Sequence, residues 1–487
     1  KFGKVDLAGV DASRATDVRG LMNTQAGQPF SLVTLSGDRD AVLEYYLAHG
    51  FDQVKVEIKQ QKEATDPDKT DVSLNVTEGQ QVFVNKVLLS GVEKTKPSVV
   101  QGQILVHAGD PLDQTALLET QRNLYNIALF NEVVAAVQNP TGDAPEKNVL
   151  IQLTEAKRWN VTYGFGFEAQ TGTPGQGKIS DASRIQLGLP LGGTVTQEGK
   201  PGVSPRVSLD VSRINLRGTE DTLTLHSAFG LLEQVAILTL QNPHFYGSKT
   251  WSGAISGGYS NVRDITTFTS STLQGDFRLT QRPQRKDTFI YDFQYRRVKV
   301  DPNSLQVSAD LIPLLSQPVR VGGPGITWFH DTRSPSPLDA VKGSYSTVQM
   351  FVASSKFGSE TNFWKVDGSN STYYQFGKEK YVLARSTRIG YERSWGTNPN
   401  AGSDACLGDL LTTNPSCSAV PLPERLYAGG ATSLRGFGIN GAGPRDLQTG
   451  FPVGGTAALV NTIEFRMPAP TLPFVGNSVN FVVFHDT

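Results

Sequence analysis

Hydrophobic residues follow two different spacings along the chain, and the change falls near Trp159. Before that residue, segments with apolar residues three or four positions apart alternate with short strand-like runs, which is typical of small α+β domains. After it, apolar and polar residues alternate one by one, as in "TFIYDFQYRR" at 288–297. This alternation predicts strands with one apolar and one polar face.

The first 156 residues contain an internal repeat. "VDLAGV" at 5–10 returns as "VLLSGV" at 87–92, and "AGQPF" at 26–30 returns as "AGDPL" at 108–112. "VSLNVTEG" at 72–79 then returns as "VLIQLTEA" at 149–156. A period of about 80 residues is too long for a solenoid unit, so the repeat predicts two tandem domains, 1–79 and 80–156.

Each copy predicts the order strand, helix, helix, strand, strand. In the second copy we expect a first strand at 84–89, helices at 96–107 and 117–128, and strands in "EVVAAV" and "NVLIQL". The second helix carries one apolar stripe, made of Leu118, Leu124, Tyr125 and Ala128. Recurring aromatic residues are expected to pack in the two cores: Tyr46, Tyr125, Phe51 and Phe130. The exposed sheet edges of such modules can bind an incoming strand.

The region after Trp159 predicts thirteen strands. They are expected at 158–169, 205–216, 220–230, 233–243, 249–260, 265–280, 286–299, 324–333, 343–354, 361–376, 379–395, 455–468 and 477–486. Several are longer than the five or six residues usual in globular proteins, and about ten residues suits a tilted strand that crosses a bilayer. A soluble sandwich shows the same alternation, but the number and length of the strands favour an antiparallel transmembrane β-barrel.

Composition narrows the classes of function. The net charge is −1, which favours neither nucleic acid nor an anionic membrane surface as a partner. No run of about 18 apolar residues exists, so a transmembrane helix is excluded, although a barrel is not. The chain starts at Lys1 and stops inside the apolar segment "FVVFHDT". We therefore expect a processed piece that lacks the last strands of the barrel.

Two cysteines, Cys406 and Cys417, lie in the polar loop sequence "DACLGDLLTTNPSCSA". They could be two free thiols, but their proximity in a loop favours a local disulfide and an oxidising compartment.

No motif in the chain predicts catalysis, a metal or a cofactor. The six histidines are scattered, and "HDTRSP" at 330–335 lacks a nucleophile motif, so a turn at a strand end is favoured. "DPDKTD" at 66–71 lacks the glycine and glutamate of a calcium loop and predicts a hairpin. "GFGF" at 164–167 lies on a strand with no helix after it, which argues against phosphate binding.

Two glycines of that first barrel strand, Gly164 and Gly166, suggest a different role. The first strand must pair with the last to close a barrel, and glycine weakens a strand interior. We hypothesise a lateral seam here, where the barrel opens and offers an edge to a client strand.

The two modules, the barrel pattern and "GGATSLRGF" at 429–437 together resemble the Omp85 superfamily. This family contains outer-membrane assembly factors of the BamA/TamA type and two-partner secretion transporters. The resemblance covers essentially the whole chain. It implies two POTRA domains and a barrel of the 16-stranded type at 157–487, with its signature arginine in a long loop, here 396–454.

The resemblance implies that Arg435, Gly436 and Phe437 fold back into the lumen of the barrel. There the arginine would pair with Asp486, with Glu464 as a second acid, and Phe437 would pack against the inner wall. Strand parity supports both acids independently, since each lies opposite an apolar face: Ile463, Phe465 and Met467 in one strand, Val479, Phe481 and Val483 in the other. Leu434 departs from the valine or isoleucine common in the family. Cys406 and Cys417 would lie on the extracellular side.

The implied function is assembly and insertion of outer-membrane proteins. POTRA domains in the periplasm would receive unfolded β-barrel clients by strand addition, and the barrel would template their entry into the lipid bilayer. Accessory lipoproteins or periplasmic proteins are further expected partners, whereas nucleic acid and cofactors are not. One alternative is a two-partner-secretion-type polypeptide transporter. An alternative of another class is a passive porin or receptor barrel, against which the POTRA repeats argue.

Overall fold

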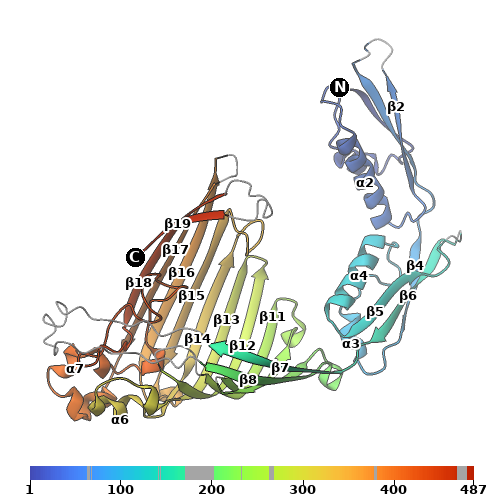
Figure 1. The fold of residues 1–487 in the computed structure, drawn as a ribbon. Coiled ribbons are helices and arrows are strands. Elements are labelled where there is room, and N and C mark those ends of the chain that lie inside the picture. Colours follow the sequence, from blue (N-terminus) through green and yellow to red (C-terminus); the bar gives the residue numbers. More distant parts are fainter. Residues whose placement is uncertain are drawn as a thin grey trace. The chain divides into compact units, whose positions relative to one another are not determined.

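The computed structural model describes the chain except residues 63–65, 67, 141, 143, 171–201, 232, 263–267, 378–380 and 469–479. It separates into two compact units (Figure 1). The first contains Lys1–Arg158 and Ile214–Glu220, and the second contains Trp159–Arg213 and Asp221–Thr487. None of the described helices is long and apolar enough to cross a bilayer.

The first module consists of β1 (Phe2–Ala8), α1 (Ala15–Gly20), α2 (Leu32–Ala48), β2 (Lys55–Lys62) and β3 (Thr70–Thr77). Its sheet has the order β1-β3-β2, with β1 parallel and β2 antiparallel to the central strand. Strand β3 alternates in sequence, so Val72, Leu74 and Val76 all face the core. Helix α2 covers them with Leu35, Val42 and Tyr46.

The second module repeats this order with β4 (Phe83–Ser90), α3 (Pro97–Gln101), α4 (Gln114–Asn126), β5 (Phe130–Val137) and β6 (Glu146–Glu155). Its sheet order is β4-β6-β5. Helix α3 is shorter than the expected 96–107. It ends before Gly102, and the chain after it places Val106 in the core.

The aromatic prediction holds for Tyr46, Phe51 and Phe130, which are buried, but it is wrong for Tyr125. Tyr125 is 61% exposed and Leu118 is 67% exposed. Helix α4 instead buries Leu117, Thr120 and Leu124. The buried face of α4 is therefore turned by about one residue from the expected face. Successive residues of a helix lie about 100° apart, so an apolar pattern that is off by one residue predicts the neighbouring face.

The second unit contains one antiparallel sheet in which each strand pairs with its neighbours in sequence. Its strands are β7 (Trp159–Gln170), β8 (Gly202–Arg213), β9 (Thr222–Gly230), β10 (Glu233–Asn242), β11 (Trp251–Val262), β12 (Ser270–Gln284), β13 (Asp287–Val300), β14 (Val319–Asp331), β15 (Gly343–Ala353), β16 (Phe363–Phe376), β17 (Tyr381–Ser394), β18 (Ala457–Pro468) and β19 (Asn480–Asp486). All thirteen expected strands are confirmed. Expected strand residues 265–267, 379–380 and 477–479, including Val479, lie outside the described residues.

The two faces of this sheet settle the choice between sandwich and barrel. One face, which we call the outer face, exposes large apolar side chains such as Phe165 (78%), Ile389 (59%) and Leu459 (69%). The opposite, inner face carries polar side chains, including Asp292, which is only 9% exposed. A soluble sandwich would bury the apolar face, so this arrangement is that of a membrane barrel wall.

Candidate functional site: the loop on the inner face of the barrel wall

The long loop between β17 and β18, residues 395–456, folds over the inner face of the sheet. Isolated bridges pair Leu426 with Gly455 and Ala428 with Ala442, so the segment carrying the motif is anchored at its base. The turn then passes through Gly429 and Gly430, whose φ angles are +114° and +100°. A Cβ on Gly429 would lie 2.5 Å from the Gly438 carbonyl oxygen, so only glycine fits.

Arg435 lies at the far end of this loop and contacts two acids of the wall. Its Nε and Nη2 donate to the two carboxylate oxygens of Asp486, each at 2.8 Å, and its backbone N–H donates to Asp486 Oδ2 at 3.0 Å. Its Nη1 donates to Glu464 Oε1 at 3.1 Å. The Asp486 side chain is only 4% exposed, so this bidentate pair is shielded from solvent.

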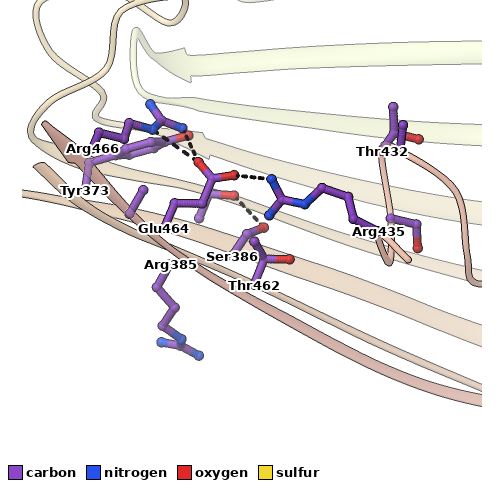
Figure 2. Close-up of a pocket in the computed structure, with 12 residues that line it drawn as sticks. Tyr373, Arg385, Ser386, Thr432, Arg435, Thr462, Glu464 and Arg466 are labelled. Atoms are coloured by element: carbon purple, nitrogen blue, oxygen red, sulfur yellow. Dashed lines mark hydrogen bonds and ion pairs between the residues drawn. The ribbon is translucent and has the colours of Figure 1, made fainter. Parts of the chain in front are cut away.

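A second arginine completes the cluster. Arg466 donates from Nε and Nη2 to Glu464 Oε2, at 3.1 and 2.8 Å (Figure 2). Glu464 therefore bridges two guanidinium groups, and the two arginines balance the two carboxylates. The Arg435 guanidinium also lies over the ring of Phe484, with its central carbon 3.4 Å from the ring centroid.

Strand register brings these groups together. Strands β18 and β19 pair Thr462 with Asp486 and Glu464 with Phe484, so alternate residues of both strands face the loop. Thr462, Glu464 and Arg466 of β18 and Arg435 of the loop line a cavity of about 240 Å³, together with Ser371, Tyr373 and Ser386 from β16 and β17. Most of the wall residues that line this cavity are polar, which suits this part of the wall to a charged loop.

The structure brings three of the predicted residues together: Arg435, Asp486 and Glu464. Gly436 adopts a φ of +92°, which a glycine accommodates without strain. Phe437 is 53% exposed, and its packing against the inner wall stays a prediction. Its carbonyl accepts a hydrogen bond from the Gly430 N–H at 3.1 Å, which fixes the turn.

Arg466 and Phe484 had no assigned role in the sequence analysis. Both have the parity of a predicted inner residue, since Arg466 follows Glu464 by two positions and Phe484 precedes Asp486 by two. Parity could therefore have placed them on the inner face. It could not have shown that Arg466 shares Glu464 with Arg435.

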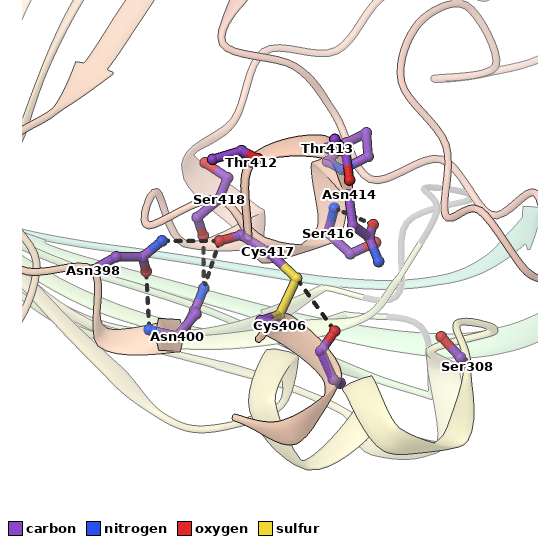
Figure 3. The surroundings of a disulfide bond; sticks show 12 residues. Ser308, Asn398, Asn400, Cys406, Thr412, Thr413, Asn414, Ser416, Cys417 and Ser418 are labelled. Carbon is purple, nitrogen blue, oxygen red and sulfur yellow. Dashed lines mark hydrogen bonds between the residues drawn. A yellow bond between two sulfur atoms is a disulfide. The ribbon is translucent and has the colours of Figure 1, made fainter. Parts of the chain in front are cut away.

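The same long loop forms a small core with the loop after β13. Cys406 and Cys417 are joined in a disulfide, and both are fully buried (Figure 3). They pack among Leu305, Leu311 and Phe451, which come from both loops. Asp446 links the loops further, since it accepts hydrogen bonds from Ser308 at 3.3 Å and from Ser416 at 3.2 Å. We call these two packed loops the cap. It also contains two short helices, α6 (Ile312–Leu315) and α7 (Leu410–Thr413).

Two adjacent charged residues hold this region in place: Glu424 contacts the wall, and Arg425 contacts the loop itself. Glu424 accepts a bidentate ion pair from Arg296 of β13, at 2.9 and 2.6 Å. Arg425 is only 4% exposed and donates to backbone carbonyls of the loop, including those of Val420 and Val453. Burial lowers the pKa of Arg425, and these carbonyl acceptors stabilise its charge. Nothing in the local sequence around them indicated this role.

The glycines proposed for a seam lie at the other edge of the described sheet. Gly164 and Gly166 belong to β7, which pairs with β8 without a bulge from Trp159 to Gln170. A Cβ on Gly164 would lie 2.7 Å from Ser208 Oγ, whereas one on Gly166 would meet nothing within 4 Å.

The His330 and Asp331 side chains of "HDTRSP" form ion pairs at the end of a strand. His330 and Asp331 end β14, where Asp331 pairs with Arg333 and His330 with Asp287. Within the described part of the chain, no group of three metal-ligating side chains is close enough to hold an ion.

Comparison with known proteins gives the same architecture. The family model of the Omp85 superfamily domain matches residues 215–487, and that of POTRA, the surface antigen variable number repeat, matches residues 1–79 and 82–156. The outer membrane protein assembly factor BamA of Nitratidesulfovibrio vulgaris is 21% identical over 463 residues, covering 93% of this chain and 51% of that protein. The chain thus spans about half the length of this curated relative.

A solved structure shares the fold. The crystal structure of BamA from Haemophilus ducreyi lacking POTRA domains 1–3 matches with a TM-score of 0.72 and 16% identity, covering 100% of this chain and 86% of that one. Together with the two family models, it identifies an outer-membrane barrel wall preceded by two periplasmic POTRA domains. The chain belongs to the Omp85 superfamily.

Proposed function

We propose that this protein assembles outer-membrane proteins, by accepting unfolded β-barrel clients at its POTRA domains and templating their insertion through a lateral seam of the barrel. The observation that carries the proposal is the unpaired strand edge of the sheet in each POTRA domain, among the described residues. A relative that aligns with most of the chain is an assembly factor, which supports the same function.

Both POTRA domains offer such an edge. Strand β2 pairs only with β3, and β5 pairs only with β6, so the opposite edge of each is free in the described residues. Strand β2 has the sequence "KVEIKQQK", which is charged and therefore resists uncontrolled pairing. A client segment can add to these edges through backbone hydrogen bonds that do not depend on its sequence.

Strand β7 is the first strand of the barrel wall. It pairs with β8 alone among the described strands, and it carries Gly164 and Gly166 on its inner face. Glycine contributes no side-chain packing, so a strand added at this edge would be easy to displace. We assign the lateral seam to β7.

The Arg435 loop would stabilise the pairing of β18 and β19, at the edge of the described sheet opposite β7. Its bonds to Asp486 and Glu464 hold β18 and β19 in register from the inside. In our proposal this loop braces the wall while β7 exchanges partners.

A crosslinking experiment in the full-length protein tests this function. A disulfide would join β7 to the strand that closes the barrel, and folding of an unfolded β-barrel client would be followed in proteoliposomes. The matched control is a disulfide between Val161 and Val211, which already face each other in β7 and β8. We expect the first crosslink to stop client folding, reduction to restore it, and the control to have no effect.

Other outcomes would favour the alternatives. Client folding that continues with the seam closed would contradict the insertion mechanism. Passage of a polypeptide into the vesicles without client folding would indicate a secretion transporter, and ion conductance alone would indicate a passive porin.

A further inference from the structure

The outer face of β17 carries an arginine between apolar residues. Along this face the strand places Tyr381, Leu383, Arg385, Thr387 and Ile389 in that order, opposite inner residues such as Arg388. Figure 2 shows the Arg385 side chain directed away from Glu464 and Arg435. Leu383 and Ile389, on either side of it, are 37% and 59% exposed. Arg385 therefore lies on the face that contacts lipid.

Arg385 is too deep to be an ordinary residue of the membrane rim. Strand β17 starts at Tyr381 and runs in the same direction as β7, which directly follows the POTRA domains, so its start is the periplasmic end. Four residues of a strand tilted by about 40° correspond to roughly 10 Å of depth. Phe376, Tyr381 and Phe465 stack at this end and form an aromatic girdle. Arg385 lies beyond it, inside the periplasmic leaflet.

Polar residues on neighbouring strands surround this arginine. Strand pairing places Thr372 of β16 opposite Arg385, and Asn370 and Asn461 on the two sides of Thr387. These side chains are connected: Arg385 Nε donates to Thr387 Oγ1 at 3.0 Å, and Thr387 Oγ1 donates to Asn461 Oδ1 at 2.6 Å. Thr372 donates to Asn370 Oδ1 at 2.9 Å. The result is a polar patch on β16–β18 within an apolar wall.

Hydrogen-bond donors of this patch remain unused. In the described residues, the two Nη groups of Arg385 and the side-chain nitrogen Nδ2 of Asn461 have no acceptor. No Asp or Glu side chain lies in the outer-face rows of Thr387 and Arg385 from β15 to β19, so the side chains of the patch are positive and rich in donors. A planar guanidinium with two free Nη groups matches a phosphate, which accepts two parallel hydrogen bonds.

We propose that the polar patch formed by Asn370, Thr372, Arg385, Thr387 and Asn461 binds the phosphate of a phospholipid from the periplasmic leaflet. Arg385 binds the phosphate through its Nη groups, and Asn461 donates to the phosphate or to an ester oxygen. The acyl chains then lie along the apolar residues on either side, such as Ile389 and Leu459.

Lipid binding to the full-length protein in mild detergent, measured by native mass spectrometry, tests this site. The probes are phosphatidylglycerol, diacylglycerol as the phosphate-free lipid, and inorganic phosphate. The variants are Arg385→Leu, Arg385→Lys and Arg385→Gln, and the matched control is Arg393→Leu, an exposed arginine on the outer face near the other end of the same strand. Circular dichroism and heat-modifiable electrophoresis report whether each variant folds.

We expect Arg385→Leu and Arg385→Gln to weaken the tightest phosphatidylglycerol site about tenfold, which corresponds to about 1.4 kcal/mol. Arg385→Lys should lose less, because it keeps the charge but not the paired donors. Arg393→Leu should bind as the parent does, and diacylglycerol should not occupy the site. Unchanged binding in both Arg385→Leu and Arg385→Gln, an equal loss in Arg393→Leu, or equal binding of diacylglycerol would overturn the proposal. Binding of inorganic phosphate as tight as that of the lipid would overturn its assignment to a phospholipid.

Discussion

At the scale of single residues, Arg435 makes contacts that no other side chain reproduces. Its guanidinium bonds both oxygens of Asp486 and one of Glu464, while its flat surface covers Phe484. A lysine ammonium is a point donor on a flexible chain, so it can neutralise one acid but cannot bridge both and stack on the ring. The site therefore depends on the shape of the cation as well as on its charge.

Arg435→Ala should destabilise the loop by about 3 kcal/mol, because it leaves the shielded Asp486 carboxylate without its partner. Arg435→Lys should recover only part of this loss. Protease accessibility of residues 426–446 in the full-length protein measures the release of the loop. The double variant Arg435→Ala/Asp486→Asn should be no worse than Arg435→Ala alone. A loop that stays protected in Arg435→Ala would contradict the proposed bracing role.

A second group of interacting side chains, centred on Glu78, lies in the first POTRA domain. Glu78 accepts hydrogen bonds from Tyr46 at 2.6 Å and from the Asp11 N–H at 2.8 Å, and it forms an ion pair with Arg14. Burial alone would raise the pKa of Glu78, but these bonds outweigh it and lower the pKa below its ordinary value of 4.5. Burial and the bond to Glu78 raise the pKa of Tyr46.

Glu78 therefore stabilises the domain above about pH 4.5, and this stability is lost as the pH falls through its lowered pKa. Glu78→Gln should cost about 1 to 2 kcal/mol at pH 7 and should flatten the fall in stability between pH 5 and pH 3. Hydrogen exchange of the first module within the whole chain measures both effects. The exposed Glu57→Gln is the control, and an identical pH profile for Glu78→Gln and the parent would refute the assignment.

At the scale of elements, the two POTRA domains use equivalent residues of the sequence repeat for the same structural purposes. Glu155, the counterpart of Glu78, accepts the N–H groups of Lys94 and Thr95 after β4. Gly9 and Gly91 both turn the chain after the first strand, with φ angles of +79° and +82°. A Cβ on Gly91 would lie 1.8 Å from the Leu153 carbonyl oxygen, so the close approach to the central strand requires glycine.

Gly91→Ala should destabilise the second POTRA domain by more than about 2 kcal/mol, since it adds both a clash and backbone strain. Limited proteolysis of residues 80–156 in the whole chain measures this loss. Gly20→Ala is the control, because a Cβ there meets nothing within 4 Å and its φ is not positive. Equal protection of Gly91→Ala and Gly20→Ala would show that the close approach is not needed.

At the scale of the whole molecule, the inner and outer faces of the barrel wall have different functions. The inner face supplies the acids that hold the long loop, and the outer face supplies the apolar surface that lipid covers. Because side chains alternate, neighbouring residues such as Glu464 and Ile463 serve opposite faces. A shift of register by one residue would place charges in lipid and apolar groups in the lumen, so the same pattern that defines the strands also protects their pairing.

Much of this architecture could be predicted from the sequence because it depends on local rules. Alternation with a period of two defined all thirteen strands, and the same parity placed Glu464 and Asp486 on one side of their strands. The repeat near 80 residues indicated two modules with the order strand, helix, helix, strand, strand. Such features follow from the side-chain periodicity of strands and helices, which does not depend on the tertiary surroundings.

Other features were decided only by the tertiary structure. The buried side of α4 was set by the sheet beneath it, so Leu117 is covered and Tyr125 is not. The exposed ring of Phe437 and the burial of Cys406 depend on how distant loops meet. The polar patch around Arg385 exists because strand register aligns residues far apart in the chain. Alternation determines which face of a strand a residue occupies, but long-range packing and register determine what that residue touches.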